Sequence, residues 1–89
     1  MEKAIKLYGL SSCAHCKSLR NFLIDSGVAF DWTYVDMLVG EERSRAMKAL
    51  KAINPSCSFP TLVVEGDVVV GYKKDKVREL IAAYRRKSE

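Results

Sequence analysis

Cys13 and Cys16 are the residues of this chain whose type and spacing most directly imply chemistry. They lie within the stretch LSSCAHCKSL at positions 10–19. Thiols at this spacing form a redox couple, provide half of a metal site, or are ordinary thiols. A closed structural zinc site normally has four protein ligands, and His15 and Cys57 are the only other imidazole and thiol groups in the sequence. We therefore do not expect a closed zinc site.

The elements around the two cysteines determine which thiol reacts. Residues 4–8 alternate in character and predict a strand, and the turn after it offers Ser11 or Ser12 as a helix N-cap. Apolar residues at helical spacing then predict a helix over 13–26, with Gly27 at its C-terminal end. The first cysteine of the pair therefore falls in the first turn of this helix.

The start of a helix favours a thiolate, because unpaired backbone N–H groups and the positive end of the helix dipole lie there. The thiolate is the attacking species in thiol–disulfide exchange, so we expect Cys13 to be the nucleophile. Cys16 faces the same side one turn later and deeper, which suits a resolving thiol. His15 either raises the thiolate fraction, faces solvent as a bystander, or ligates a metal; we favour the first.

The rest of the chain predicts an alternation of strands and helices. We expect a strand over 28–36, a helix over 41–53, a hairpin over 61–72 with its turn at 65–67, and a helix over 75–87 with Asp75 as N-cap. The resulting order is β-α-β-α-β-β-α. A strand, helix and strand of this length form a right-handed parallel crossover, and the hairpin extends the sheet antiparallel. Phe30 and Trp32 are expected to pack the sheet against its helices.

Composition narrows the class of protein. The chain has 89 residues, of which 48% are hydrophobic and 29% charged, so we expect one folded domain over 1–89. No apolar run is long enough to span a membrane, and the first residues lack the apolar segment of a secretory signal. The net charge is +4, but the aromatic residues are not interleaved with a basic stripe, so we expect no nucleic-acid binding. A cytoplasmic location is the default expectation.

Two motifs carry a resemblance to a known family. The C-x-x-C pair follows the first predicted strand, and SCSFPTLVV at 56–64 opens the third. In size, element order and motif placement, nearly the whole chain resembles the glutaredoxins of the thioredoxin superfamily. The resemblance implies an α/β thioredoxin-like fold, with a four-stranded mixed sheet flanked by three helices. It also implies a cis Pro60 beside the dithiol and a substrate paired with the backbone of Phe59, next to Ser58.

The segment VGYKKDK at 70–76 departs from the glutathione site of that family, which commonly has two glycines followed by two acidic residues. Lysines stand where the acids would fall, and Lys73 and Lys74 are expected to attract a carboxylate of glutathione or an acidic protein. The segment also resembles the Gly-Phe-Arg-x-Asp pattern of the glutaredoxin-like redoxins that serve ribonucleotide reductase. Gly71, Tyr72, Lys73 and Asp75 match that pattern in kind, which implies electrons from thioredoxin reductase.

Further departures lie at the dithiol itself. Ala14 and His15 replace the usual Pro-Tyr between the cysteines, and Leu10 replaces a basic residue often found three positions before the first cysteine. Tyr8 and Tyr72 are expected to line the groove. The third thiol, Cys57, has either a redox or a structural role, and we favour the structural one.

The sequence thus predicts a small electron carrier that reduces protein disulfides or glutathione mixed disulfides through Cys13 and Cys16. We expect a monomer without a tightly bound cofactor, reduced by glutathione or by a thioredoxin reductase with NADPH. Two alternatives remain: an iron–sulfur or metal carrier of the glutaredoxin type, and a non-enzymatic binding module on the same fold.

Overall fold

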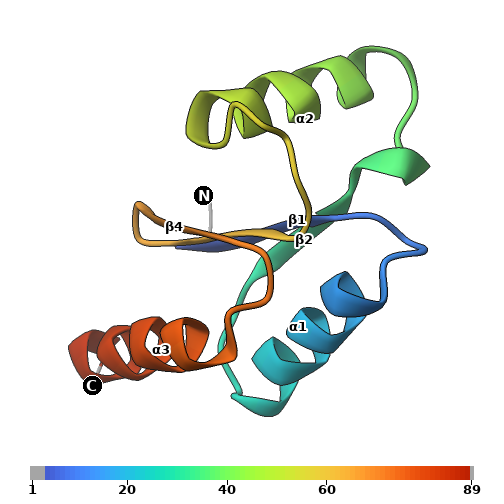
Figure 1. Ribbon diagram of the computed structural model, residues 1–89. Helices are drawn as coiled ribbons and strands as arrows, with labels where there is room; N and C mark the ends of the chain where they lie inside the picture. The colour runs from blue at the N-terminus through green and yellow to red at the C-terminus, as the bar shows by residue number, and fades with distance from the viewer. Residues whose placement is uncertain (1–3, 89) are drawn as a thin grey trace.

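The computed structural model describes residues 4–88 (Figure 1); residues 1–3 and 89 of the predicted domain lie outside them. Within residues 4–88, four strands and three α-helices follow the predicted order, with one short 3₁₀ helix added. They are β1 (Ile5–Gly9), α1 (Ala14–Asp25), β2 (Asp31–Tyr34), η1 (Val35–Met37), α2 (Gly40–Ile53), β3 (Thr61–Val64), β4 (Asp67–Val70) and α3 (Lys74–Ser88). None of the described helices has the length and apolar character needed to cross a membrane.

The strands form one mixed sheet in the order β2-β1-β3-β4. β1 and β2 run parallel, whereas β3 is antiparallel to both β1 and β4. Figure 1 shows α2 on one face of the sheet and both α1 and α3 on the other. This arrangement confirms the predicted thioredoxin-like fold, in which the parallel crossover carries α1 and the hairpin extends the sheet.

Alternation along the strands divides the core between the two faces of the sheet. Ile5 and Leu7 of β1 belong to the larger cluster, which also contains buried residues of α1 and α3. Tyr8 points to the opposite face and forms a smaller buried cluster with Val35 and Leu50, beneath α2. Leu10, Met47, Cys57 and Phe59 pack against this smaller cluster. The cluster beneath α2 therefore contacts both the loop that carries the two cysteines (residues 10–16, the dithiol loop) and the segment before β3.

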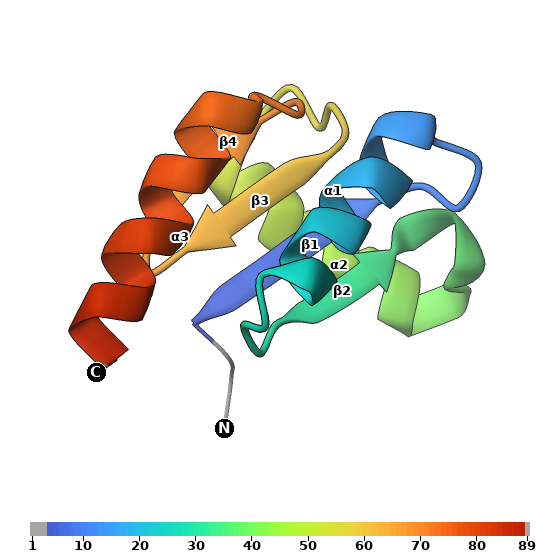
Figure 2. The same cartoon turned by 90° about the horizontal axis from the view of Figure 1, so that it is seen from below.

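The strand register brings the ends of β1, β2 and β4 and the start of β3 to the same end of the sheet, which we call the sheet edge. Gly9 at the end of β1 pairs with Tyr34 at the end of β2, while Tyr8 pairs with Thr61 at the start of β3. Thr61 in turn pairs with Val70 at the end of β4. Figure 2 shows the start of α1, the segment before β3 and the segment after β4 at this same end of the molecule.

The second strand is shorter than predicted. β2 covers Asp31–Tyr34 rather than 28–36, because the chain turns into η1 at Val35, which is buried under α2. The expectation that Trp32 packs into the core is wrong: its side chain is 48% exposed, because β2 is an edge strand. The Trp32 ring lies 5.7 Å from the Phe30 ring and 5.6 Å from the Arg20 guanidinium carbon, in a cation–π contact.

Two further boundaries differ in detail. α3 begins at Lys74, so Asp75 lies inside its first turn rather than at the N-cap, where a carboxylate still favours the helix dipole. The hairpin turn consists of Glu65 and Gly66 alone, rather than 65–67, because Asp67 already pairs with Val64. Both turn residues have a positive φ. Positive φ at both central residues is the geometry of a type I′ turn, which matches the twist of the strands.

The segment between α2 and β3 is held by Asn54, which is 5% exposed. Its Nδ2 donates to Thr61 Oγ1 at 3.0 Å and to the Ser58 carbonyl at 3.3 Å, and its Oδ1 accepts from Ser56 Oγ at 2.6 Å. Thr61 Oγ1 also donates to the Ser58 carbonyl, at 2.7 Å. These bonds fix the path of residues 54–61, so one side chain positions the whole segment that precedes β3.

Replacing Asn54 by alanine should lower the free energy of unfolding by about 1–3 kcal/mol, because buried partners lose their donor. The measurement is urea denaturation. Asn21→Ala on the exposed face of α1 is the control and should change the unfolding free energy by less than about 0.5 kcal/mol. Equal stability of the Asn54→Ala variant and the wild type would show that the segment is positioned by other contacts.

Candidate dithiol site

Cys13 is the N-cap of α1, with the extended backbone conformation of that position. Its Sγ accepts the backbone N–H of Cys16 at 3.3 Å, and its carbonyl accepts the N–H of Lys17 at 3.1 Å. The prediction of Ser11 or Ser12 as N-cap is therefore wrong. The reason is that the Ser11 side chain is engaged elsewhere, leaving the thiol to take the position where an oxygen is usual.

The surroundings of Cys13 favour its thiolate. Hydrogen bonding from the Cys16 thiol lowers the pKa of Cys13 most, and the backbone N–H groups of Cys16 and His15 lower it further. Cys13 is only partly buried, so its sulfur is accessible to a substrate. His15 contributes through its backbone and its side chain is exposed; tuning by its imidazole stays a prediction.

Cys16 has the opposite environment. Its side chain is 0% exposed, and this burial, together with hydrogen bonding to Cys13, raises its pKa to about 11. A β-carbon placed on Gly9 would lie 3.0 Å from both Cβ and Sγ of Cys16, so only glycine leaves Cys16 its present room at the end of β1. At neutral pH Cys16 is therefore a protonated donor beneath Cys13.

The dithiol loop is anchored to η1 across the sheet edge. Asp36 accepts the Ser11 backbone N–H at 2.9 Å through Oδ1, and Oδ2 accepts the Ser11 hydroxyl. These two hydrogen bonds lower the pKa of Asp36, with a smaller contribution from the charge of Arg43. Residues 10–13 form a turn within this loop, in which the Cys13 N–H donates to the Leu10 carbonyl at 3.1 Å.

The segment before β3 contributes Ser58, Phe59 and Pro60 to the same edge. The Phe59–Pro60 peptide bond is cis, as expected. Phe59 and Leu10 pack against the same buried cluster beneath α2, and Leu10 lies three residues before the first cysteine. The Gly71 N–H donates to the Pro60 carbonyl at 2.7 Å, which joins the segment after β4 to the segment before β3.

The remaining predicted residues surround this centre at different depths. Tyr8, which was expected to line the groove, is 5% exposed and lies in the buried cluster beneath α2. Tyr72 packs against the core cluster shared with α3, whereas Lys73, Lys74 and Asp75 are exposed at the start of α3. Their roles in substrate binding stay predictions.

Cys57 lies three residues before Pro60 and is partly buried against the α2-side cluster, with a φ of 52°. This packing is compatible with the structural role that we favoured and leaves the redox role as a prediction. Among residues 4–88, no group of three or more His, Cys, Asp or Glu side chains has an arrangement that holds a metal ion.

Three residues that position the site were not predicted from the sequence: Gly9, Asp36 and Asn54. A glycine at the end of a strand signals a close approach, so Gly9 could have been found. Asn54 directly follows the helix predicted over 41–53, and a polar residue at that position has the means to bond the following loop. Asp36 gave no local signal, because its partner lies 25 residues away.

Comparisons with known proteins agree with this architecture. The family model described as Glutaredoxin matches residues 5–69. A solved glutaredoxin of Archaeoglobus fulgidus is 40% identical with a TM-score of 0.82, covering 88% of this chain and 85% of its own. Methanoredoxin of Methanosarcina acetivorans is 42% identical with a TM-score of 0.81, covering 86% and 82%. An uncharacterized glutaredoxin-like protein of the Clostridium pasteurianum rubredoxin operon is 23% identical, covering 86% of this chain and 96% of its own.

The hydrogen bond from the Cys16 thiol predicts a difference between two variants at that position. Cys16→Ala removes the donor and should raise the pKa of Cys13 toward its ordinary value, whereas Cys16→Ser keeps a hydroxyl donor and should hold this pKa low. The measurement is the pH dependence of alkylation by iodoacetamide, in a Cys57→Ser background so that one thiol reacts. The rate falls as the pH drops through the pKa of Cys13, because the thiolate becomes protonated.

The fall should therefore begin at a higher pH in Cys16→Ala than in Cys16→Ser. Circular dichroism of both variants checks that α1 is intact. Identical pH profiles would show that the Cys16 side chain has no part in stabilising the Cys13 thiolate.

Proposed function

Because this chain belongs to the glutaredoxin family, we propose that it is a thiol–disulfide oxidoreductase that reduces protein disulfides or glutathione mixed disulfides through Cys13 and Cys16. The observation that carries the proposal is the contrast between the two thiols. Cys13 is accessible at the N-cap of α1 with a lowered pKa, and Cys16 is buried beneath it with a raised one.

The proposed reaction has two displacements. The Cys13 thiolate attacks one sulfur of the substrate disulfide, forming a mixed disulfide while the other substrate sulfur leaves as a thiolate. Cys16 then loses its proton to the leaving group and attacks Cys13 Sγ, which releases the second substrate sulfur as a thiolate that takes a proton from solvent. The protein dithiol becomes a disulfide, and its two electrons reduce the substrate disulfide to two thiols.

The order of attack follows from burial. The substrate reaches Cys13, whereas Cys16 has no exposed surface and is available only to a sulfur already bound to Cys13. Once Cys13 is in a mixed disulfide, it no longer shares the Cys16 proton, so Cys16 ionises more readily than in the resting protein.

We further propose that the sheet edge holds the substrate. The backbone of Phe59, between Ser58 and Pro60, is proposed to pair with the chain beside the substrate cysteine, by its likeness to the family. Gly71 is joined to Pro60 by a hydrogen bond and brings Tyr72 and the start of α3 to the same edge. There Lys73 and Lys74 would attract a carboxylate, next to Asp75.

Regeneration of the dithiol requires a two-electron donor, which we propose to be glutathione or a thioredoxin reductase with NADPH. The likeness of residues 71–75 to the ribonucleotide reductase redoxins supports the reductase, and family membership supports glutathione. A reducing compartment such as the cytoplasm suits a carrier that rests with free thiols. We propose that the protein acts as a monomer on disulfide-containing proteins.

A single-turnover assay tests the proposed function without a choice of donor. Pre-reduced protein is mixed with a peptide that contains an intramolecular disulfide, and the free thiols of the peptide are followed by chromatography. Cys13→Ser should lower the rate by at least about 10³-fold, because a serine hydroxyl does not replace a thiolate nucleophile.

Cys57→Ser is the matched control and should leave the rate unchanged, because Cys57 is interpreted as a structural thiol. Retention of peptide reduction by Cys13→Ser would overturn the assignment of the nucleophile. Loss of reduction in Cys57→Ser alone would transfer the redox role to that residue.

A further inference from the structure

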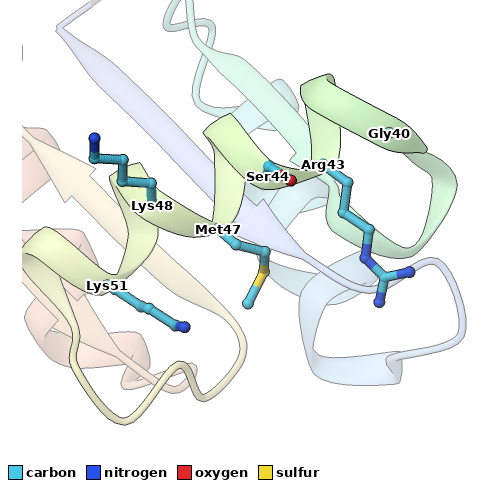
Figure 3. Close-up of a pocket in the computed structure, with 6 residues that line it drawn as sticks. All are labelled: Gly40, Arg43, Ser44, Met47, Lys48 and Lys51. Carbon is cyan, nitrogen blue, oxygen red and sulfur yellow. The ribbon is translucent and has the colours of Figure 1, made fainter.

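A basic pocket lies on one face of α2, away from the start of α3. It has a volume of about 460 Å³, within the range of ligand sites, and it is lined by Gly40, Arg43, Ser44, Met47, Lys48 and Lys51. Figure 3 shows Arg43, Met47 and Lys51 projecting to the same side of α2, with Lys48 on the other rim. Three of the lining side chains are cationic and none is acidic.

The acidic residues of α2 point elsewhere. Glu41 pairs with Arg45 at 3.3 Å, and Glu42 lines a different pocket together with Lys6 and Thr33 of the sheet. The carboxylate that does act on Arg43 is Asp36, whose two oxygens are both engaged by Ser11. Asp36 offsets part of the charge of Arg43, and the pocket keeps a net positive charge through Lys48 and Lys51.

The pocket adjoins the dithiol through two of its residues. Met47 packs against the same buried cluster as Leu10, from the dithiol loop, and Phe59, from the segment before β3. Arg43 interacts with Asp36, which holds the loop two residues before Cys13. The pocket is therefore linked to the dithiol loop through the contacts of Met47 and Arg43.

The connection from η1 to α2 extends this surface. Met37 and Val39 are 69% and 80% exposed, and they lie between Asp36 and Gly40. Gly40 has no atom within 4 Å of the position of a β-carbon, so this end of the pocket is open. Exposed apolar side chains beside a basic pocket form a contact surface for a polypeptide rather than for an isolated ion.

The length of the pocket also favours a polypeptide. Arg43 and Lys51 are eight residues apart on α2, which corresponds to about 12 Å along the helix axis. An extended chain covers this distance with about four residues. From this length, the charge and the position beside the dithiol, we propose that the α2 pocket binds an acidic segment of the protein substrate, next to the disulfide that Cys13 attacks. This inference rests on the proposed oxidoreductase function.

Two disulfide peptides test the proposal in the single-turnover assay. One carries glutamates on both sides of its disulfide, and the other carries glutamines at the same positions. Wild-type protein should reduce the acidic peptide about tenfold faster at low ionic strength, from three exposed charge pairs. The preference should shrink as salt is added, because exposed charges are screened.

The triple variant Arg43→Gln, Lys48→Gln, Lys51→Gln, which retains Lys73 and Lys74, should lose most of this preference while still reducing the neutral peptide. The matched control is Arg78→Gln, Arg85→Gln, Arg86→Gln, which removes the same charge from exposed positions on α3 and should keep the preference. Equal loss in both triple variants would assign the effect to overall charge and overturn the proposal. Equal reduction of both peptides by the wild type would also overturn it, while leaving the oxidoreductase function intact.

Glutathione disulfide is the small-molecule arm of the same assay. Its reduction should respond much less to the α2 triple variant than that of the acidic peptide. A loss confined to glutathione disulfide, with peptide preference retained, would assign the pocket to a small thiol and overturn the proposal. Failure of the wild type to reduce any of the three disulfides would instead contradict the proposed function itself.

Discussion

The hydrogen bond from the Cys16 backbone N–H to the Cys13 sulfur is the interaction on which the site depends. A helix N-cap usually presents an oxygen to the free N–H groups of the first turn. In this protein the acceptor is a sulfur that ionises, so the bond that caps α1 also helps to stabilise the thiolate, together with the hydrogen bond from the Cys16 thiol. The same turn places Cys16 against Gly9, where no larger residue fits without displacement. Two identical side chains thereby acquire pKa shifts of opposite sign.

The sheet supplies the frame that keeps this turn in place. Parallel pairing of β1 with β2 and antiparallel pairing with β3 bring the dithiol loop, η1 and the segment before β3 to one edge. Polar side chains then fix each loop: Asp36 holds Ser11, and Asn54 holds the segment that leads to Pro60. The site is thus positioned by partners distant in sequence, although its reactive residues are close together.

Much of the fold and the place of the dithiol could be predicted, because strand alternation, helical spacing and the C-x-x-C motif are local signals. The exceptions have physical causes outside any local window. Ser11 or Ser12 was predicted as the helix N-cap, but the Ser11 hydroxyl donates to Asp36, and Cys13 caps the helix instead. Trp32 continues an alternating pattern, yet it lies on an edge strand and remains half exposed. The basic face of α2 was not predicted as a pocket, because charged residues at exposed helix positions usually form a solvated face.

Covalent trapping distinguishes the attacking thiol, Cys13, from the resolving thiol, Cys16. Each single variant, Cys13→Ser and Cys16→Ser, is incubated with a disulfide peptide, and the adduct is located by mass spectrometry after proteolysis. We expect a stable mixed disulfide on Cys13 in Cys16→Ser, because no resolving thiol remains. We expect no adduct on Cys16 in Cys13→Ser, because that sulfur is buried. An adduct on Cys16 formed as readily as the one on Cys13 would contradict the asymmetry of the two thiols.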